Sequence, residues 1–200
     1  MRVIGLTGGI ACGKSTVAGI LRELSARVVD ADEVARELLA PGSPVLARVA
    51  ERFGRKVLRE DGSLDRQRLA EIVFRDRQAL ADLNAITHPP IVARIRQRIQ
   101  EARREGVRVL VIDAPLLLEA GMQGMVDEVW VVTCTRDQQI ERLCRRTGLS
   151  PSEAEARTRA QMPLEEKLGR ADRVIPNEGS LAQLRAEVER HWQDLASRRI

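Results

Sequence analysis

Short apolar runs alternate with helical patterns along most of the chain. Five runs have the length and the β-branched content of buried strands, and they span residues 2–7, 27–30, 107–113, 128–134 and 173–175. Between them, apolar side chains recur at intervals of three and four residues, which is the period of a helix. This alternation predicts an α/β fold of three layers (α/β/α), in which helices cover both faces of a five-stranded parallel sheet.

The middle of the chain, residues 45–105, contains no strand-like run. Its helical patterns are interrupted by Pro-Gly at 41–42, Asp-Gly at 61–62 and Pro-Pro at 89–90. We therefore expect a helical insertion carried by the sheet, with one helix starting at the two prolines.

The last helical pattern of this insertion has an apolar stripe and a basic face. The stripe consists of Ile91, Ile95, Ile99 and Ala102, and the basic face of Arg94, Arg98 and Arg104. Two interpretations stay open: the stripe faces the core and the arginines face water, or the basic face contacts a polyanionic ligand.

We expect one domain over residues 1–200. Its core comprises about residues 1–40, 106–146 and 171–200, and the helical insertion about 41–105. Residues 147–170, rich in Ser, Glu, Arg and Gln, suit a mobile helical lid that closes over a site.

Composition narrows the classes of partner. The 200 residues are 44% hydrophobic and 31% charged, with a net charge of +4 and only four aromatic residues. A surface that binds single-stranded nucleic acid needs exposed aromatic residues among basic ones, so no nucleic-acid partner is expected. The three cysteines and two histidines lack the spacing of metal ligands or of a disulfide framework. With no signal peptide and no membrane-length apolar run, we expect a cytoplasmic protein without a membrane partner.

The candidate chemistry begins with GGIACGKS at residues 8–15, which matches G-x-x-x-x-G-K-[ST] between a predicted strand and a predicted helix. Such a loop turns backbone N–H groups inward at a helix N-terminus, where they hold a phosphate chain. Lys14 is expected to reach the β- and γ-phosphates, and the Ser15 hydroxyl to bind Mg²⁺. The predicted nucleotide-binding loop comprises Gly8, Gly9, Ile10, Ala11, Cys12, Gly13, Lys14, Ser15 and Thr16.

Two residues of this loop stand out. The chain has three lysines, Lys14, Lys56 and Lys167, against thirty arginines, so a lysine in the loop indicates a requirement for a compact ammonium. Cys12 lies beside Lys14 at a helix N-terminus, which is expected to lower the pKa of its thiol. Either it undergoes oxidation that depends on nucleotide binding, or the loop simply accepts a small residue there.

Acidic residues at strand ends supply candidates for proton transfer. The second strand ends in Asp30-Ala31-Asp32, so one aspartate can cap the next helix while the other accepts a proton from an attacking hydroxyl. Asp113 ends the third strand and either binds Mg²⁺ through water or is a structurally paired acid. His88 either caps or packs a helix, or contacts a substrate.

Five motifs in order resemble the dephospho-coenzyme A kinase family over nearly the whole chain. They are GLTGGIACGKSTVA, VVDADEVAREL, HPP at 88–90, APLLLE at 114–119 and ADRVIPNEGS at 171–180. The resemblance implies the P-loop NTPase fold of the nucleoside monophosphate kinase group, with core, substrate and lid regions. It also implies transfer of the ATP γ-phosphate to the ribose 3'-hydroxyl of dephospho-CoA.

The resemblance also implies roles for particular residues. Asp32 matches the general base, and Arg142 and Arg146 match arginines that neutralise the transferring phosphoryl group beside Lys14. Asn177 matches a residue near the adenine of ATP. Pro115, Leu116 and Glu119 match the acceptor pocket, to which His88 is added as a candidate. Ala11, Cys12 and Leu118 depart from the family, which usually has glycine, serine and phenylalanine there.

Other nucleotide-dependent functions compete with this interpretation. A nucleoside or sugar kinase would use the same phosphate loop, and so would a non-catalytic nucleotide-binding switch. The guanine-reading element Asn/Thr-Lys-x-Asp of a GTPase is missing from the sequence. We expect ATP and Mg²⁺ as cofactors, a small-molecule acceptor, and a monomer or weak homo-oligomer.

Overall fold

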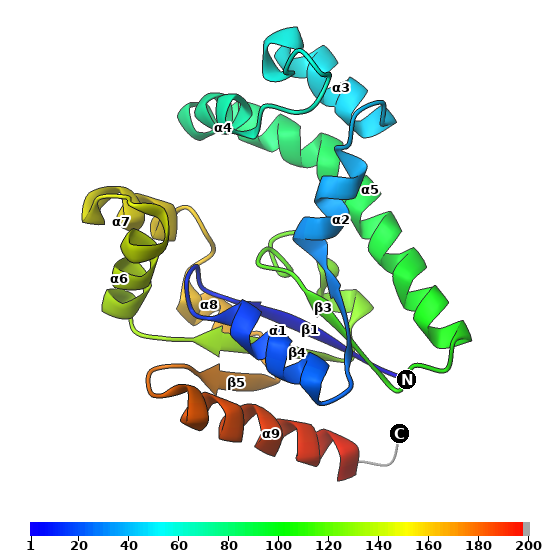
Figure 1. Ribbon diagram of the computed structural model, residues 1–200, viewed down its shortest axis with the longest axis vertical. Coiled ribbons are helices and arrows are strands. Elements are labelled where there is room, and N and C mark those ends of the chain that lie inside the picture. The colour runs from blue at the N-terminus through cyan, green and yellow to red at the C-terminus, as the bar shows by residue number, and fades with distance from the viewer. Residues whose placement is uncertain (198–200) are drawn as a thin grey trace. The chain divides into compact units, whose positions relative to one another are not determined.

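The structure, a computed structural model, describes residues 1–197 (Figure 1). Residues 198–200, the end of the predicted core, lie outside the described residues. The strands are β1 Arg2–Gly8, β2 Arg27–Asp30, β3 Val109–Asp113, β4 Glu128–Thr133 and β5 Arg173–Pro176. The α-helices are α1 Lys14–Glu23, α2 Ala31–Leu38, α3 Pro44–Phe53, α4 Arg66–Arg75, α5 Arg77–Arg104, α6 Arg136–Thr147, α7 Pro151–Arg159, α8 Leu164–Leu168 and α9 Leu181–Ser197. Two short 3-10 helices are η1 Arg55–Val57 and η2 Met122–Met125.

The five strands form one parallel sheet in the order β2-β3-β1-β4-β5, which confirms the predicted fold class. β1 is the central strand, and its side chains are buried from Val3 onward. α1 and α9 cover one face of the sheet (Figure 1). Ile4 and Leu6 belong to the core on this side, together with the fully buried Trp130 and Leu21. Because parallel strands all end at the same edge, the loops after β1, β3, β4 and β5 emerge side by side.

The chain divides into two compact units. The first contains residues 1–30 and 99–200 and therefore the whole sheet. The second contains residues 31–98, with α2, α3, α4 and most of α5. Within the described residues the second unit has an isolated antiparallel bridge between Leu58 and Leu64 but no named strand, as predicted.

The second unit has its own apolar core. Ser43 caps α3 by accepting the Leu46 N–H at 3.0 Å, and Asp65 caps α4 by accepting the Arg68 N–H at 3.0 Å. These caps fix where the two helices begin and so which faces they bury. The core comprises Leu46, Val49, Phe53, Val57, Leu64, Leu69, Val73 and Ala79.

The expectation that a helix begins at the two prolines is wrong. Pro89 and Pro90 lie inside the continuous helix α5, so His88 is a mid-helix residue rather than a cap. Each proline lacks the N–H that would bond four residues back, which usually costs about 3 kcal/mol. Residues buried along α5 on both sides of the prolines, among them Ala79 and Ile95, offset this cost through packing.

The apolar stripe and basic face of α5 are as predicted. Ile95, Ile99 and Ala102 are buried. On the other side Arg98 approaches Glu37 of α2 at 3.5 Å and Arg94 approaches it at 3.9 Å. The two arginines therefore contact an acid of their own unit, which favours the structural interpretation over a polyanionic ligand.

No helix in the described part of the chain is both long and apolar enough to cross a membrane.

A buried ionic cluster holds β4, β5 and α9 together. Arg173 donates to the Glu128 carboxylate at 2.7 Å and is 2.7 Å from Asp194. Trp130 Nε1 donates to the same Glu128 oxygen at 2.9 Å, and the His191 ring lies 5.6 Å from the indole. Burial lowers the pKa of His191, so its neutral form is favoured beside the arginine.

The first prediction concerns this cluster. Arg173→Ala leaves Glu128 buried without its cation, so we expect the free energy of unfolding to fall by about 3–5 kcal/mol. Arg185→Ala is the matched control, because the ion pair of Arg185 with Glu23 is exposed and screened by solvent. Urea unfolding of both variants measures the difference. Equal losses would contradict the assignment of this cluster as a stabilising element.

Candidate functional site

The phosphate loop connects the end of β1 to the start of α1. Gly8 is the last residue of β1, and a Cβ built on it would lie 2.5 Å from the Val132 carbonyl oxygen of β4. The loop can therefore leave the sheet here only with glycine. Gly13 is the N-cap of α1, with φ of 90°, in the left-handed region that favours glycine.

Asn177 holds the loop from the end of β5. Its Nδ2 donates to the Cys12 carbonyl at 2.8 Å, and a Cβ on Gly13 would lie 2.2 Å from the same nitrogen. The Asn177 backbone N–H donates to the Thr133 carbonyl at 2.8 Å, which fixes the residue at the edge of the sheet. Asn177 thus supports the phosphate loop directly. The sequence predicted only that it lies near the adenine of ATP.

Ala11 adopts φ of 59°, which is rarely accessible to a residue with a Cβ. Its neighbour Ile10 donates its backbone N–H to Gln161 Oε1 at 3.0 Å. Gln161 follows α7, in the region predicted to be a lid. A side-chain oxygen of the predicted lid therefore accepts a hydrogen bond from a backbone N–H of the phosphate loop.

Lys14 and Asp113 form an ion pair between α1 and the end of β3. The Asp113 side chain is only 6% exposed and the Lys14 side chain 17%, so the pair is largely shielded from water. Register places Asp113 opposite Asp30 of β2, so two carboxylates end neighbouring strands. Asp113 is thus a structurally paired acid, which is one of its two predicted roles. It also lies at the end of β3, where an acid that binds Mg²⁺ through water is expected.

Ser15 and Thr16 are exposed in the first turn of α1, beside Lys14. Magnesium keeps most of its ligands as water and phosphate oxygens, so one hydroxyl with a nearby carboxylate is a sufficient protein donor set. Ser15 and Asp113 fit this requirement chemically. Among the described residues, no three His, Cys, Asp or Glu side chains gather as a complete metal site.

Arg142 projects from α6 toward the same edge. Its Nη2 donates to the Asn177 carbonyl at 3.0 Å. Its Nη1 is buried and, among the described residues, has no hydrogen-bond partner. A buried guanidinium nitrogen without an acceptor is costly, which makes it a candidate anion contact. Arg146, one turn later, is exposed.

The residues after β3 are tied to α8 by a buried lysine. Lys167 is fully buried, and its Nζ lies 2.9 Å from Glu119 Oε1 and donates to the Pro115 carbonyl at 2.8 Å. Glu119 also accepts the Met162 N–H at 3.3 Å, while its Oε2 is buried with no partner in the described residues. Leu116 is 40% exposed beside this polar group.

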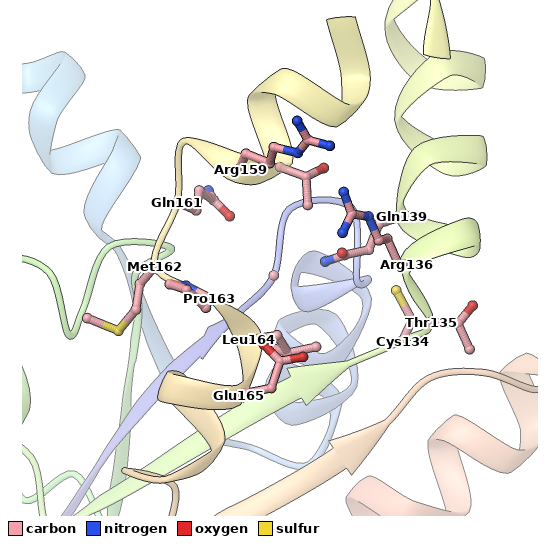
Figure 2. A pocket seen from close by; sticks show the side chains of 12 residues that line it. Cys134, Thr135, Arg136, Gln139, Arg159, Gln161, Met162, Pro163, Leu164 and Glu165 are labelled. Carbon is pink, nitrogen blue, oxygen red and sulfur yellow. The ribbon is translucent and has the colours of Figure 1, made fainter. Parts of the chain in front are cut away.

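A pocket of about 480 Å³ opens between the phosphate loop and residues 158–165 (Figure 2). Figure 2 shows Cys134 and Gln139 on one wall and Gln161 and Met162 on the segment opposite. Gly9 contributes the loop's side of the pocket.

Asp32 and His88 belong to the second unit. Asp32 is exposed in the first turn of α2, immediately after Asp30 and Ala31. His88 is half-buried in α5, and burial lowers its pKa, so its neutral form is favoured near pH 7. Within the first unit the structure brings together the phosphate loop, Asp113, Arg142 and Asn177.

Sequence reasoning missed Gln161 and the role of Lys167. Gln161 lies in a polar segment rich in glutamate and arginine, and nothing in the local pattern shows that its side chain reaches Ile10. A signal for Lys167 did exist, because it is one of three lysines in a chain that otherwise uses arginine. The same rarity also applies to Lys56, which is exposed, so it marks Lys167 as a candidate but does not distinguish a buried lysine from an exposed one.

Comparison with known proteins agrees with these features. The model of the family described as dephospho-CoA kinase matches residues 2–183. A dephospho-CoA kinase of Carboxydothermus hydrogenoformans is 50% identical over 93% of this chain and 90% of its own length. One of Symbiobacterium thermophilum is 52% identical over 96% of this chain and 81% of its own length.

Solved structures give the same picture. A dephospho-CoA kinase from Campylobacter jejuni is similar with a TM-score of 0.74 and 32% identity, over 98% of each chain. A shikimate kinase from Bacteroides thetaiotaomicron has a TM-score of 0.55 at 14% identity, which indicates a shared fold alone.

The second prediction tests the packing of the loop. Gly13→Ala adds a Cβ at positive φ and against Asn177, whereas Gly42→Ala adds one at φ of 80° with nothing within 4 Å. We expect Gly42→Ala to cost about 1–2 kcal/mol from backbone strain. Gly13→Ala should cost a further 1–3 kcal/mol, approximately, from overpacking. Urea unfolding compares the two, and equal costs would show that Asn177 yields without penalty.

Proposed function

This chain belongs to the dephospho-CoA kinase family, and from that premise we propose which of its residues carry out the reaction. The reaction transfers the γ-phosphate of ATP to the ribose 3'-hydroxyl of dephospho-CoA and yields coenzyme A and ADP. The observation that carries the assignment is the family match over residues 2–183, which includes an intact phosphate loop at the end of the central strand.

The loop binds the phosphates of ATP. Its backbone N–H groups and the N-terminus of α1 favour negative charge. Lys14 exchanges Asp113 for the β- and γ-phosphates, and Ile10 exchanges Gln161 for a phosphate oxygen. Both exchanges replace an internal contact that the loop makes without ligand.

Ser15 would hold Mg²⁺, and Asp113 is the acid that would contact the ion through water. The bound ion supplies neutralisation of the charge that develops on the transferring phosphoryl group. The same requirement accounts for Arg142 and Arg146, because a loose phosphoryl transition state needs charge neutralisation more than covalent help. Arg142 Nη1 is the buried donor that an anion would satisfy.

Asp32 accepts the proton of the attacking ribose hydroxyl. Its carboxylate is exposed and follows directly on a strand end, as a general base needs. The acceptor is bound by His88, Pro115, Leu116 and Glu119, with exposed Leu116 as an apolar contact. Asn177 orients the loop and stands near the adenine.

Residues 147–170 act as the lid. Lys167 anchors α8 to Pro115 and Glu119, so the base of this segment is fixed, and the Gln161 side chain exchanges its contact with Ile10 when ATP binds. Closure over ATP excludes water and thereby prevents hydrolysis of the γ-phosphate. Core, insertion and lid work as one domain, in a monomer or weak homo-oligomer in the cytoplasm, without a nucleic-acid or membrane partner.

The third prediction tests the acceptor. With magnesium ATP, the chain should release ADP rapidly with dephospho-CoA and much more slowly with nucleosides, sugars or shikimate. Coupled ADP release across this panel is the measurement, and ATP without acceptor gives the hydrolysis background. Turnover on a nucleoside together with none on dephospho-CoA would overturn the assignment.

The fourth prediction concerns the general base. Asp32→Asn should keep ATP affinity and lower kcat by about 10²–10⁴-fold, because the hydroxyl loses its proton acceptor. Glu33→Gln is the matched control, since it removes the charge of the adjacent exposed residue of α2. Near-normal turnover of Asp32→Asn with a large loss in Asp30→Asn would assign the base to Asp30.

A further inference from the structure

Two cysteines that are far apart in sequence meet beneath the phosphate loop. The Sγ atoms of Cys12 and Cys134 are 3.1 Å apart, although 122 residues separate them. Cys12 is fully buried and Cys134 is 4% exposed. Cys12 points from the loop into the core that α1 and α9 cover, and Cys134 directly follows β4. A disulfide has an S–S length of about 2.05 Å, so roughly 1 Å of movement separates the thiols from a bond.

The surroundings make the two thiols unequal. Cys12 Sγ accepts from the Cys134 thiol and from Gln139 Nε2, which is 3.1 Å away. The bond from Cys134 and that from Gln139 outweigh burial and lower the pKa of Cys12 to about 7. The bond to Cys12 and burial raise the pKa of Cys134. Cys12 is therefore the nucleophilic thiolate of the pair, and Cys134 is the thiol that can react with it afterwards.

The pair is close to a route from solvent. Cys134 and Gln139 line the 480 Å³ pocket beside Gly9, on the same wall (Figure 2). Gln139, which contacts Cys12, is itself 5% exposed. Cys134 lines this pocket, whereas Cys12 is fully buried behind Gln139, so a small hydroperoxide reaches the Cys12 sulfur only after the Gln139 side chain has moved.

We propose that Cys12 and Cys134 form a site of reversible oxidation by small hydroperoxides, which converts the two thiols into a disulfide. The Cys12 thiolate attacks one peroxide oxygen, the O–O bond breaks, and the other oxygen leaves as water or an alcohol after taking up a proton. Cys134 sulfur then attacks the sulfenic sulfur of Cys12 and releases water. The two thiols lose two electrons and the peroxide gains them, so no other reactant is needed.

The disulfide would act on nucleotide binding, a consequence that rests on the proposed function. Joining the sulfurs pulls Cys12 toward the end of β4, while Asn177 holds its carbonyl at 2.8 Å. Ala11, the preceding residue, already has a φ of 59°, a region that a residue with a Cβ seldom adopts, so it leaves the backbone little freedom to compensate. The backbone N–H groups of the phosphate loop would therefore shift away from the positions in which they bind the phosphates of ATP, so the affinity for ATP falls.

The experiment treats the whole protein with hydrogen peroxide and maps its disulfides by mass spectrometry. We expect a Cys12–Cys134 disulfide within one chain, a free Cys144, and formation that accelerates as pH rises through about 7, where Cys12 becomes a thiolate. We expect oxidation to lower the affinity of the protein for ATP by at least about tenfold, and dithiothreitol to restore it. Cys144→Ser, which changes the third thiol, should behave like the unchanged chain.

Cys134→Ala separates the oxidation of Cys12 to a sulfenic acid from the formation of the disulfide. Without its partner, Cys12 should stop at the sulfenic acid, which dimedone traps, whereas the unchanged chain should yield little trapped product. Cys134→Ser repeats this test with a smaller change in packing. Three thiols that persist under peroxide, or a disulfide that leaves ATP affinity unchanged, would overturn the proposal. Failure of the reduced protein to bind ATP would instead overturn the proposed function, because disulfide mapping does not depend on nucleotide.

Discussion

The close approach of the phosphate loop to the ends of its neighbouring strands is the constraint on which the site depends. β1 is central in the sheet, so the loop after it is surrounded by the ends of β3, β4 and β5. Gly8 has no room for a Cβ against Val132, and Gly13 has none against Asn177. Lys14, at the end of the loop, forms an ion pair with Asp113 at the end of β3. Any side chain substituted into the phosphate loop must fit the space that the ends of β3, β4 and β5 leave.

Polar groups of the phosphate loop are paired with partners from other parts of the chain. Asp113 neutralises Lys14, and Gln161 accepts from the Ile10 N–H, so neither group is left buried and unpaired. A phosphate ligand bound by Lys14 and the Ile10 N–H would replace these contacts, so its affinity would reflect the difference between the new partners and the old ones.

Features with a local signature could be predicted from the sequence, and contacts between distant segments could not. The five strands and the phosphate loop follow from short-range pattern and glycine spacing, and the structure confirms them. The start of a helix at Pro89 was wrong because local proline rules neglect the packing that carries α5 through. Gln161, the role of Asn177 on Cys12, and the Cys12–Cys134 pair depend on which loops emerge at one edge of the sheet. The sequence pattern also did not indicate that Asp32 belongs to the compact unit of residues 31–98, whereas His88 was expected in the helical insertion.

The chain passes between its two units at only two covalent crossings, after Asp30 and within α5 at residues 98–99. The sheet-containing unit buries one apolar cluster, and residues 31–98 bury another. Substitutions in the core of α3 and α4 can therefore be compensated by neighbours within residues 31–98. The residues that limit the space around the phosphate loop, Val132 and Asn177, both lie outside that segment, so natural variation can be concentrated in one part of the chain while the loop keeps its contacts.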